Sequence, residues 1–136
     1  MTVCASFNRF IKETRGAIEE LQDEGARVLS PQKPQSHSVL EGEFLLLVGD
    51  MQFPYTSVRQ VEDRHLSCIK HSDFVWLVCP GGYVGISVAM ELGFALGWGI
   101  PIYSLYQPIL EDKILETVCL VPNIKQAVLN HSTPYI

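Results

Sequence analysis

With 136 residues, of which 47% are hydrophobic and 18% are charged, the chain suits a single domain over residues 1–136 and is too apolar for a disordered segment. Ten basic against fifteen acidic residues give a net charge of -5, which argues against a nucleic acid polymer as the partner and leaves a small molecule open. Because the sequence has no leader-like N-terminus and no apolar run of roughly 18 residues, we expect a cytoplasmic protein with no membrane partner.

The cysteines predict no special chemistry. They are widely spaced, contain no CxxC pair, and three of them lie within apolar runs; the four are Cys4, Cys68, Cys79 and Cys119. Such a pattern favours reduced core thiols over disulfides or a zinc site. We therefore expect no metal and no cofactor.

The N-terminal part of the chain predicts a strand, a helix and a second strand. Residues 2–6 (TVCAS) are β-prone, and from Asn8 apolar residues recur at helical spacing until Gly25, which is placed to end the helix in a left-handed conformation. A second strand is expected at residues 26–30 (ARVLS). The predicted inner face of the helix consists of Phe10, Ile11, Thr14, Ala17, Ile18 and Leu21.

The middle of the chain begins with an expected exposed loop at residues 31–42, which contain prolines, serines and a glycine. The continuous apolar run EFLLLVGD (43–50) is typical of a strand that is covered on both faces. After it, Ser57 and Gln60 have the spacing of a capping box, which predicts a helix that runs to about residue 71.

The remaining segments continue the alternation of strand and helix. DFVWLVCP (73–80) is a second buried run, SVAMELGFALGW (87–98) a helix and PIYSL (101–105) a last central strand. Beyond residue 109, EDKILETV and NIKQAVLN have short helical periodicity. This order predicts an α/β fold with a doubly wound parallel sheet of five strands, in which ligands bind at the carboxyl ends of the strands.

The loop PGGYVGIS (80–87) is expected at that edge of the sheet. Gly81, Gly82 and Gly85 allow the backbone to approach a ligand closely, and the helix start with the Ser87 hydroxyl can bind an anion or sugar oxygens. A simple tight turn explains the glycines equally well.

Glu91 is the only charged residue of the helix over residues 87–98. If Ser87 caps this helix, a capping box needs an acid or amide at residue 90, but that residue is Met90. The helix is expected to be buried on all sides, and an ionised carboxylate there costs several kcal/mol unless it is hydrogen-bonded or faces a cavity. Glu91 is therefore predicted to face the ligand crevice as a nucleophile or base. Its apolar neighbours are Val88, Ala89, Met90, Leu92, Phe94, Ala95 and Leu96.

Three segments resemble the nucleoside 2-deoxyribosyltransferase family and its relatives that hydrolyse nucleoside 5'-monophosphates. They are VCASFNRFIKETRGAIEELQDEGARVLSP, HLSCIKHSDFVWLV and MELGFALGWGIPIYSL, and the resemblance covers residues 2–106. Its most specific part is an aspartate that opens a strand, a glycine-bearing loop, an ExGxA helix and a G-x-P strand start. These positions are Asp73, Gly85, Glu91, Gly93, Ala95, Gly99 and Pro101.

The resemblance implies a flavodoxin-like, Rossmann-like fold and a nucleoside or nucleoside monophosphate as the substrate. It implies that Glu91 attacks the anomeric carbon and forms a covalent glycosyl intermediate, which another nucleobase or water resolves. Transferase and hydrolase activity both stay open. A homo-oligomer, dimeric or larger, is expected from the resemblance alone.

Cleavage also needs a second polar group near Glu91, for which His65 is the best candidate. Helical spacing turns His65 inward. Its spacing along the sequence from Ile69 and Asp73 puts it where the deoxyribosyltransferases have an aspartate. A satisfied core imidazole is the alternative. Asp63 can supply a carboxylate instead, although a solvated partner of Arg59 explains it equally well.

The substrate side of the site departs from the family in one position. Where the transferases carry an aspartate for sugar hydroxyls, this register has Gly85, with Tyr83 nearby. Ser6, Asn8 and Arg9 follow the first strand and can contact a sugar or a 5'-phosphate. A solvated first-turn residue is the alternative for Arg9.

Two further functions compete with this one. PGGY resembles the PGGxGT loop of phosphoribohydrolases that release bases from nucleotides, but the threonine is absent and Glu91 comes about three residues too late. A nucleotide-binding or nucleotide-sensing module without turnover would explain the missing aspartate and the histidine at position 65.

Overall fold

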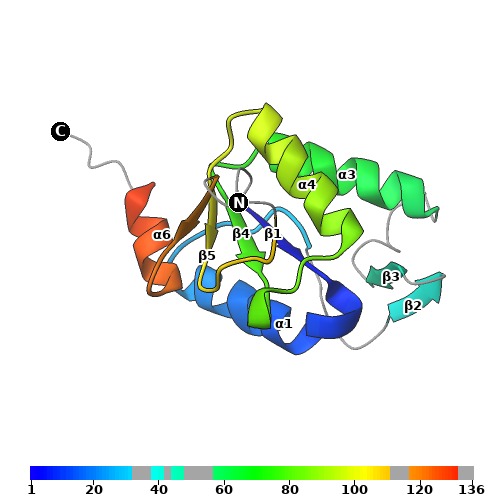
Figure 1. Cartoon of the computed structure of the whole chain (residues 1–136), viewed down its shortest axis with the longest axis horizontal. Helices are drawn as coiled ribbons and strands as arrows, with labels where there is room; N and C mark the ends of the chain where they lie inside the picture. Colours follow the sequence, from blue (N-terminus) through cyan, green and yellow to red (C-terminus); the bar gives the residue numbers. More distant parts are fainter. Residues whose placement is uncertain (32–37, 42–43, 48–56, 111–116, 132–136) are drawn as a thin grey trace.

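A parallel sheet of four strands in the order β1-β4-β5-β6 forms the centre of the computed structural model (Figure 1). The structure describes residues 1–31, 38–41, 44–47, 57–110 and 117–131. The predicted α/β class and parallel sheet are confirmed, with four strands in the described residues rather than five. The strands are β1 (Thr2–Ala5), β4 (Val75–Val78), β5 (Ile102–Ser104) and β6 (Val118–Leu120).

The central strands form because short runs of β-branched and apolar residues are buried on both faces of the sheet. Every residue of β1, β4 and β5 is buried. Cys4 of β1 pairs with Leu77 of β4, and Leu77 pairs in turn with Ser104 of β5. All pairs are parallel, so the carboxyl ends of the strands lie at one edge of the sheet.

One face of the sheet is covered by α1 (Phe7–Asp23) and α6 (Ile124–Asn130). The predicted apolar stripe of α1 is confirmed in its central part, and Gly25 follows the helix with φ of 86° as expected. The second helix confirms the periodicity of NIKQAVLN. The side chains that α1 and α6 bury are Thr14, Ala17, Ile18, Leu21, Ile124 and Ala127.

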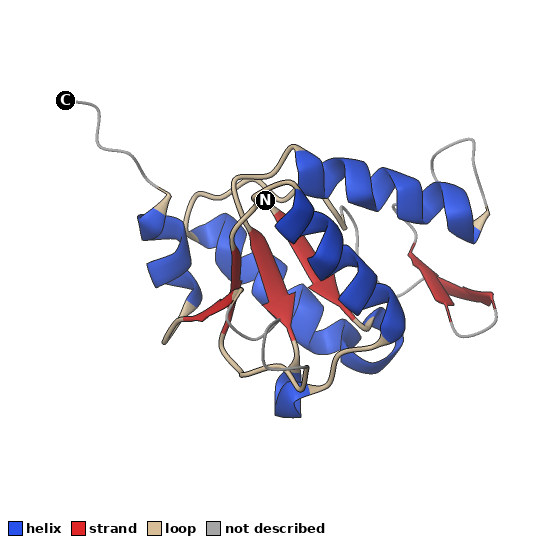
Figure 2. Cartoon of the chain, turned by 45° about the horizontal axis from the view of Figure 1, so that its top comes forward, coloured by secondary structure: helices blue, strands red, loops and turns tan. Residues whose placement is uncertain are grey.

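The opposite face is covered by α3 (Val58–Lys70) and α4 (Ile86–Gly97), which lie side by side (Figures 1 and 2). The predicted cap of α3 is confirmed, because Ser57 Oγ accepts a hydrogen bond of 3.2 Å from the backbone N–H of Gln60. From α4, the apolar side chains of Val88, Leu92 and Ala95 are buried against the sheet.

The prediction of a parallel strand at residues 43–50 is wrong for residues 44–47. There β3 (Phe44–Leu47) pairs antiparallel with β2 (Ser38–Glu41), which lies within the expected exposed loop. A local antiparallel pair closes a much shorter loop than a crossover to the central sheet, and this favours the hairpin. Residues 32–37, 42–43 and 48–56 lie outside the described part.

The expected strand at residues 26–30 is reduced to a single parallel bridge between Thr2 and Ser30. The backbone N–H of Val3 donates to Ser30 O at 2.9 Å, so this segment still runs beside β1. In the C-terminal part, the segment EDKILETV (111–118) was predicted to be helical. Its last residue, Val118, is instead the first residue of β6. Residues 111–116 are outside the described part.

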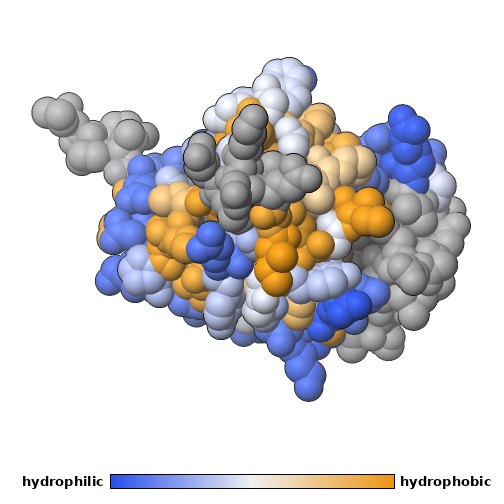
Figure 3. Space-filling model, viewed as in Figure 1, coloured by the Kyte–Doolittle hydropathy of each residue, from blue (hydrophilic) through white to orange (hydrophobic). Residues whose placement is uncertain are grey.

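The outer surface of α4 corrects the expectation of a helix buried on all sides. Ile86 is 91% exposed and Met90 50% exposed, because a helix that lies on a sheet is covered only where it meets the sheet and α3. Figure 3 shows apolar side chains at the surface over α4. None of the helices in the described residues combines the length and the apolar character needed to cross a membrane.

Candidate functional site

Glu91 lies on the inward stripe of α4, which is why a carboxylate is buried in this helix. With Val88, Leu92 and Ala95 it follows the i, i+3, i+4, i+7 spacing of one helical face, and only 3% of Glu91 is exposed. The stripe faces the sheet near the carboxyl end of β1. The burial expected of Glu91 is confirmed, whereas the ligand crevice that it was predicted to face stays a prediction.

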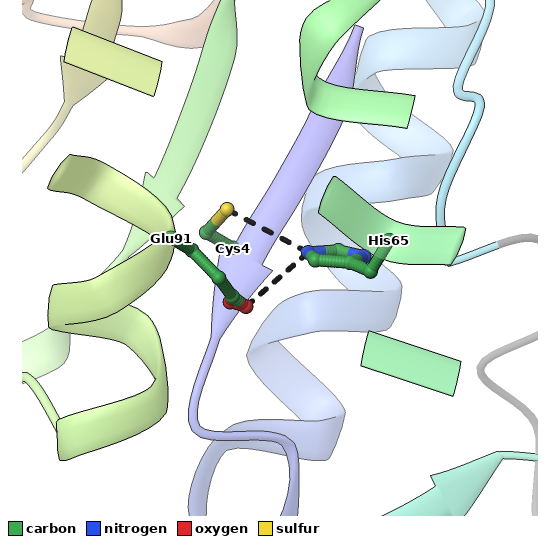
Figure 4. A group of neighbouring side chains, drawn as sticks. All are labelled: Cys4, His65 and Glu91. Atoms are coloured by element: carbon green, nitrogen blue, oxygen red, sulfur yellow. Dashed lines mark hydrogen bonds and ion pairs between the residues drawn. The ribbon is translucent and has the colours of Figure 1, made fainter. Parts of the chain in front are cut away.

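His65 is the partner of Glu91. Nε2 of His65 lies 3.3 Å from Oε1 of Glu91, and both side chains are buried (Figure 4). An ionised carboxylate can only accept, so with Glu91 in that form the contact requires a proton on Nε2 of His65. Helix α3 thus turns His65 inward as its spacing predicted.

A second hydrogen bond fixes the orientation of the His65 ring. Nδ1 of His65 lies 2.6 Å from Oγ of Ser30, which the bridge to Thr2 holds beside β1. In a neutral imidazole with its proton on Nε2, Nδ1 accepts this bond from the Ser30 hydroxyl. The ring of Phe7 also meets the imidazole edge to face, with centroids 6.1 Å apart. The ring is therefore held with Nε2 toward Glu91.

Cys4 completes the buried group. Its Sγ lies 3.7 Å from Nε2 of His65, and the residue is fully buried in β1. Burial raises the pKa of the Cys4 thiol well above its usual range, and the negative charges of Glu91 and Glu62 raise the pKa further. A protonated thiol is a poor nucleophile.

The two carboxylate oxygens of Glu91 differ. Oε1 contacts His65, whereas Oε2 is buried and has no hydrogen-bond partner within the described residues. Buried polar atoms are nearly always hydrogen-bonded in folded proteins, and an orphan one calls for a functional explanation. Oε2 therefore has lone pairs that no hydrogen bond from the described residues uses.

Part of the predicted substrate-binding set lies together at the start of α1 and α4. The guanidinium of Arg9 lies 4.1 Å from the centre of the Tyr83 ring, and the Phe10 ring lies 6.0 Å from the same ring. A side chain at Gly85 would place its Cβ 3.0 Å from Ser6 Oγ. An aspartate, the residue that the nucleoside 2-deoxyribosyltransferases have at the corresponding place, would therefore fit at position 85 only if Ser6 shifted.

The two other glycines of the loop form a tight turn. They belong to the 3-10 turn η1 (Pro80–Gly82), with φ of 68° at Gly81 and 85° at Gly82. A Cβ at Gly82 would lie 2.8 Å from Gln107 O, and Gly82 O accepts a 2.7 Å bond from the N–H of Ile109. Gly82 thus packs against the segment that follows β5, as the simple-turn alternative expects.

Three predicted residues lie apart from this group. Asp63 is on the outer side of α3, where its carboxylate pairs with Arg59 at 3.1 Å and its side chain is 57% exposed. Asn8 is exposed in the first turn of α1. Ser87 is also exposed and does not cap α4, because Gly85 is the N-cap residue.

The prediction from sequence missed Cys4 and Ser30 as neighbours of His65. A thiol at the carboxyl end of the first strand was a usable signal, since that edge is where the ligand was expected.

Comparison of the chain with protein-family models, with curated proteins and with solved structures finds no match. The geometry of Glu91, His65 and their neighbours is therefore what bears on the function.

Proposed function

We propose that this protein cleaves the N-glycosidic bond of a nucleoside or nucleotide, with Glu91 as the nucleophile and a covalent glycosyl-enzyme intermediate. The observation that carries the proposal is the state of Glu91: a buried carboxylate with Oε1 held by His65 and Oε2 without a hydrogen-bond partner in the described residues. The resemblance to nucleoside 2-deoxyribosyltransferases, and with it a flavodoxin-like fold, belongs to the same proposal.

In the first step, a lone pair of Oε2 forms a bond to the anomeric carbon while the bond from that carbon to the base nitrogen breaks. The electron pair of the broken bond goes to the base, which takes up a proton from the solvent. Positive charge that develops on the sugar is stabilised by the nearby carboxylate, and burial strengthens that interaction.

In the second step, water or another nucleobase attacks the anomeric carbon and loses a proton to the solvent, and the ester bond to Glu91 breaks. The carboxylate is restored with its electron pair on Oε2, so the protein returns to its starting state. His65 serves this cycle by holding Oε1, which fixes the direction of Oε2.

The residues around Ser6 and Tyr83 supply the substrate contacts in this proposal. The Ser6 hydroxyl beside Gly85 suits a sugar hydroxyl, and the Arg9 guanidinium stacked on Tyr83 suits a 5'-phosphate. Stacking against Tyr83 reduces the number of conformations that Arg9 loses when it binds an anion.

The test is a panel of ribonucleosides, deoxyribonucleosides and their 5'-monophosphates, incubated with the protein in the presence and absence of a free second base. Chromatography then follows base release and base exchange. We expect release or exchange from at least one substrate and its loss in Glu91→Gln. Binding without release, or equal release by the wild type and Glu91→Gln, would reject the proposal and leave a binding module in the first case.

A further inference from the structure

We propose that Cys4, His65 and Glu91 form a binding site for a divalent transition metal ion, with Zn²⁺ as the preferred ion. Cys4 Sγ, a ring nitrogen of His65 and a carboxylate oxygen of Glu91 all lie within 4.8 Å of one another. Three separate elements, β1, α3 and α4, bring them together (Figure 4). The inference does not rest on the proposed glycosidase function.

The distances fit tetrahedral coordination. Zinc bonds of about 2.3 Å to sulfur and about 2.1 Å to nitrogen and oxygen place neighbouring ligand atoms about 3.4 Å apart for N and O, and about 3.6 Å apart for S and N. The corresponding separations are 3.3 Å between His65 and Glu91 and 3.7 Å between Cys4 and His65. The third pair, Cys4 and Glu91, lies within 4.8 Å, and coordination would bring its two ligand atoms to about 3.6 Å.

The chemistry of the donors selects the ion. A thiolate, an imidazole and a carboxylate together suit Zn²⁺, whereas Mg²⁺ and Ca²⁺ prefer oxygen ligands throughout. Three protein ligands leave the fourth tetrahedral position for water, the arrangement of a zinc site that stays open to a ligand. All three side chains are buried, so the bonds form where competition from bulk water is weak.

Ser30 supplies the outer contact that a metal-binding histidine normally has. Histidine ligands of metals usually bond through their second ring nitrogen to a neighbouring group, which fixes the ring orientation. Here Nδ1 of His65 lies 2.6 Å from the Ser30 hydroxyl, which leaves Nε2 facing Cys4 and Glu91.

Metal binding changes the protonation of Cys4 and His65, and it needs no reactant other than the metal ion and the solvent. The metal ion replaces the proton of the Cys4 thiol, and this proton passes to the solvent. The single proton of the neutral His65 ring moves from Nε2 to Nδ1, which then donates a hydrogen bond to the Ser30 oxygen, and Nε2 offers its lone pair to the metal. Zn²⁺ and a sugar would compete for the Glu91 carboxylate.

The experiment is a titration of the metal-free full-length protein with Co²⁺, a spectroscopic substitute for Zn²⁺, followed by displacement with Zn²⁺. We expect about one equivalent of Co²⁺ per chain with a thiolate-to-cobalt absorption band and the visible bands of a tetrahedral ion. Zn²⁺ should abolish these bands. No substrate is present, so the outcome is independent of whether the protein cleaves nucleosides.

Three variants locate the site. Cys4→Ser should lose the thiolate band and Cys119→Ser, which changes an exposed cysteine, should keep it. Ser30→Ala should keep the band but weaken Zn²⁺ binding by about 10–100-fold. Circular dichroism establishes that each variant is folded. If Cys4→Ser unfolds, Glu91→Gln takes its place, and it should weaken Zn²⁺ binding by at least the about 10–100-fold expected for Ser30→Ala. A wild type that gives no thiolate band, or variants that all bind as the wild type does, would overturn the proposal.

Discussion

The two faces of the central sheet differ in what they bury. The face under α1 and α6 is an apolar cluster that includes Leu21 and Trp76, with the hydroxyl of Thr14 bonded to the backbone of Phe10. The face under α3 and α4 is equally well buried but carries the thiol of Cys4, the imidazole of His65 and the carboxylate of Glu91. One face thus buries mainly apolar side chains, and the other also buries the three side chains of the candidate site.

The alternation of side chains along a strand keeps these tasks apart. Val3 and Ala5 of β1 point to the α1 and α6 side, whereas Cys4 points to the α3 and α4 side. A slip of one residue in the pairing of β1 with β4 would move Cys4 away from His65, so the parallel register positions the site. The polar group tolerates burial because its members contact one another.

The largest effect is expected for Glu91→Gln. The amide has nearly the shape of the carboxylate but cannot attack the sugar, so the rate of base release should fall by about 10³-fold or more. The free energy of unfolding should stay within about 1 kcal/mol of the wild type or rise, because a buried charge is removed. Release assays and urea unfolding check this pair of results; a variant that loses stability and keeps its rate would contradict the proposed division between the faces.

The next effect compares the same substitution on both faces. Leu21→Ala and Leu92→Ala each remove a fully buried leucine side chain and should lower the free energy of unfolding by about 2–5 kcal/mol. Only Leu92, one residue from Glu91, should also lower the rate of base release per folded molecule. Urea unfolding and assays at a temperature where both variants are folded measure the difference. Equal loss of rate in both variants would show that the two faces are not separate.

A smaller effect is expected from alkaline pH through the α3 and α4 face. Burial raises the pKa of the Cys79 thiol from 9.0, and the hydrogen bond with Ser104 offsets part of this rise. As the pH rises, the unfolded chain therefore loses the thiol proton before the folded protein does. Below the pKa of the thiol in the unfolded chain, the Cys79 thiol makes its full contribution to the free energy of unfolding. Above it, the free energy of unfolding should fall by about 1.4 kcal/mol per pH unit until the folded thiol ionises. Urea unfolding from about pH 8 to 10 should show a smaller slope for Cys79→Ala, and an unchanged slope would refute the assignment.

The smallest effect is expected at the rim of the site. Arg9→Ala removes an exposed guanidinium from the Tyr83 ring, and it should raise KM for a nucleoside monophosphate by about fivefold while it leaves KM for the matching nucleoside unchanged. Steady-state kinetics on both substrates measure the ratio, and Arg15→Ala, a change elsewhere on α1, is the control. An equal change for both substrates would remove Arg9 from phosphate binding.

The sequence predicted those parts of the fold that depend on local periodicity. The stripe of α1, the cap at Ser57 and the buried run of β4 follow from spacing and from side-chain chemistry within one segment. The partner of a strand is not set locally, and for this reason the pairing of β3 with β2 and the addition of β6 to the sheet were missed.

The candidate site was also predictable only where a residue stands out within its own segment. Glu91 and His65 break the apolar pattern of helical faces, so each could be selected from its own segment. Cys4 and Ser30 do not break any pattern, since a cysteine in a strand and a serine before a proline are ordinary there. Their role depends on the bridge between Thr2 and Ser30 and on the pairing of β1 with β4, which no single segment specifies.

The most direct test is to look for the sugar on Glu91. The wild type is mixed with the nucleoside or nucleotide that releases its base fastest, quenched with acid within the first turnover, digested and examined by peptide mass spectrometry. The peptide that contains Glu91 should gain the mass of one glycosyl group, and the same peptide from Glu91→Gln should not. Rapid base release with that peptide unmodified would contradict nucleophilic attack by Glu91.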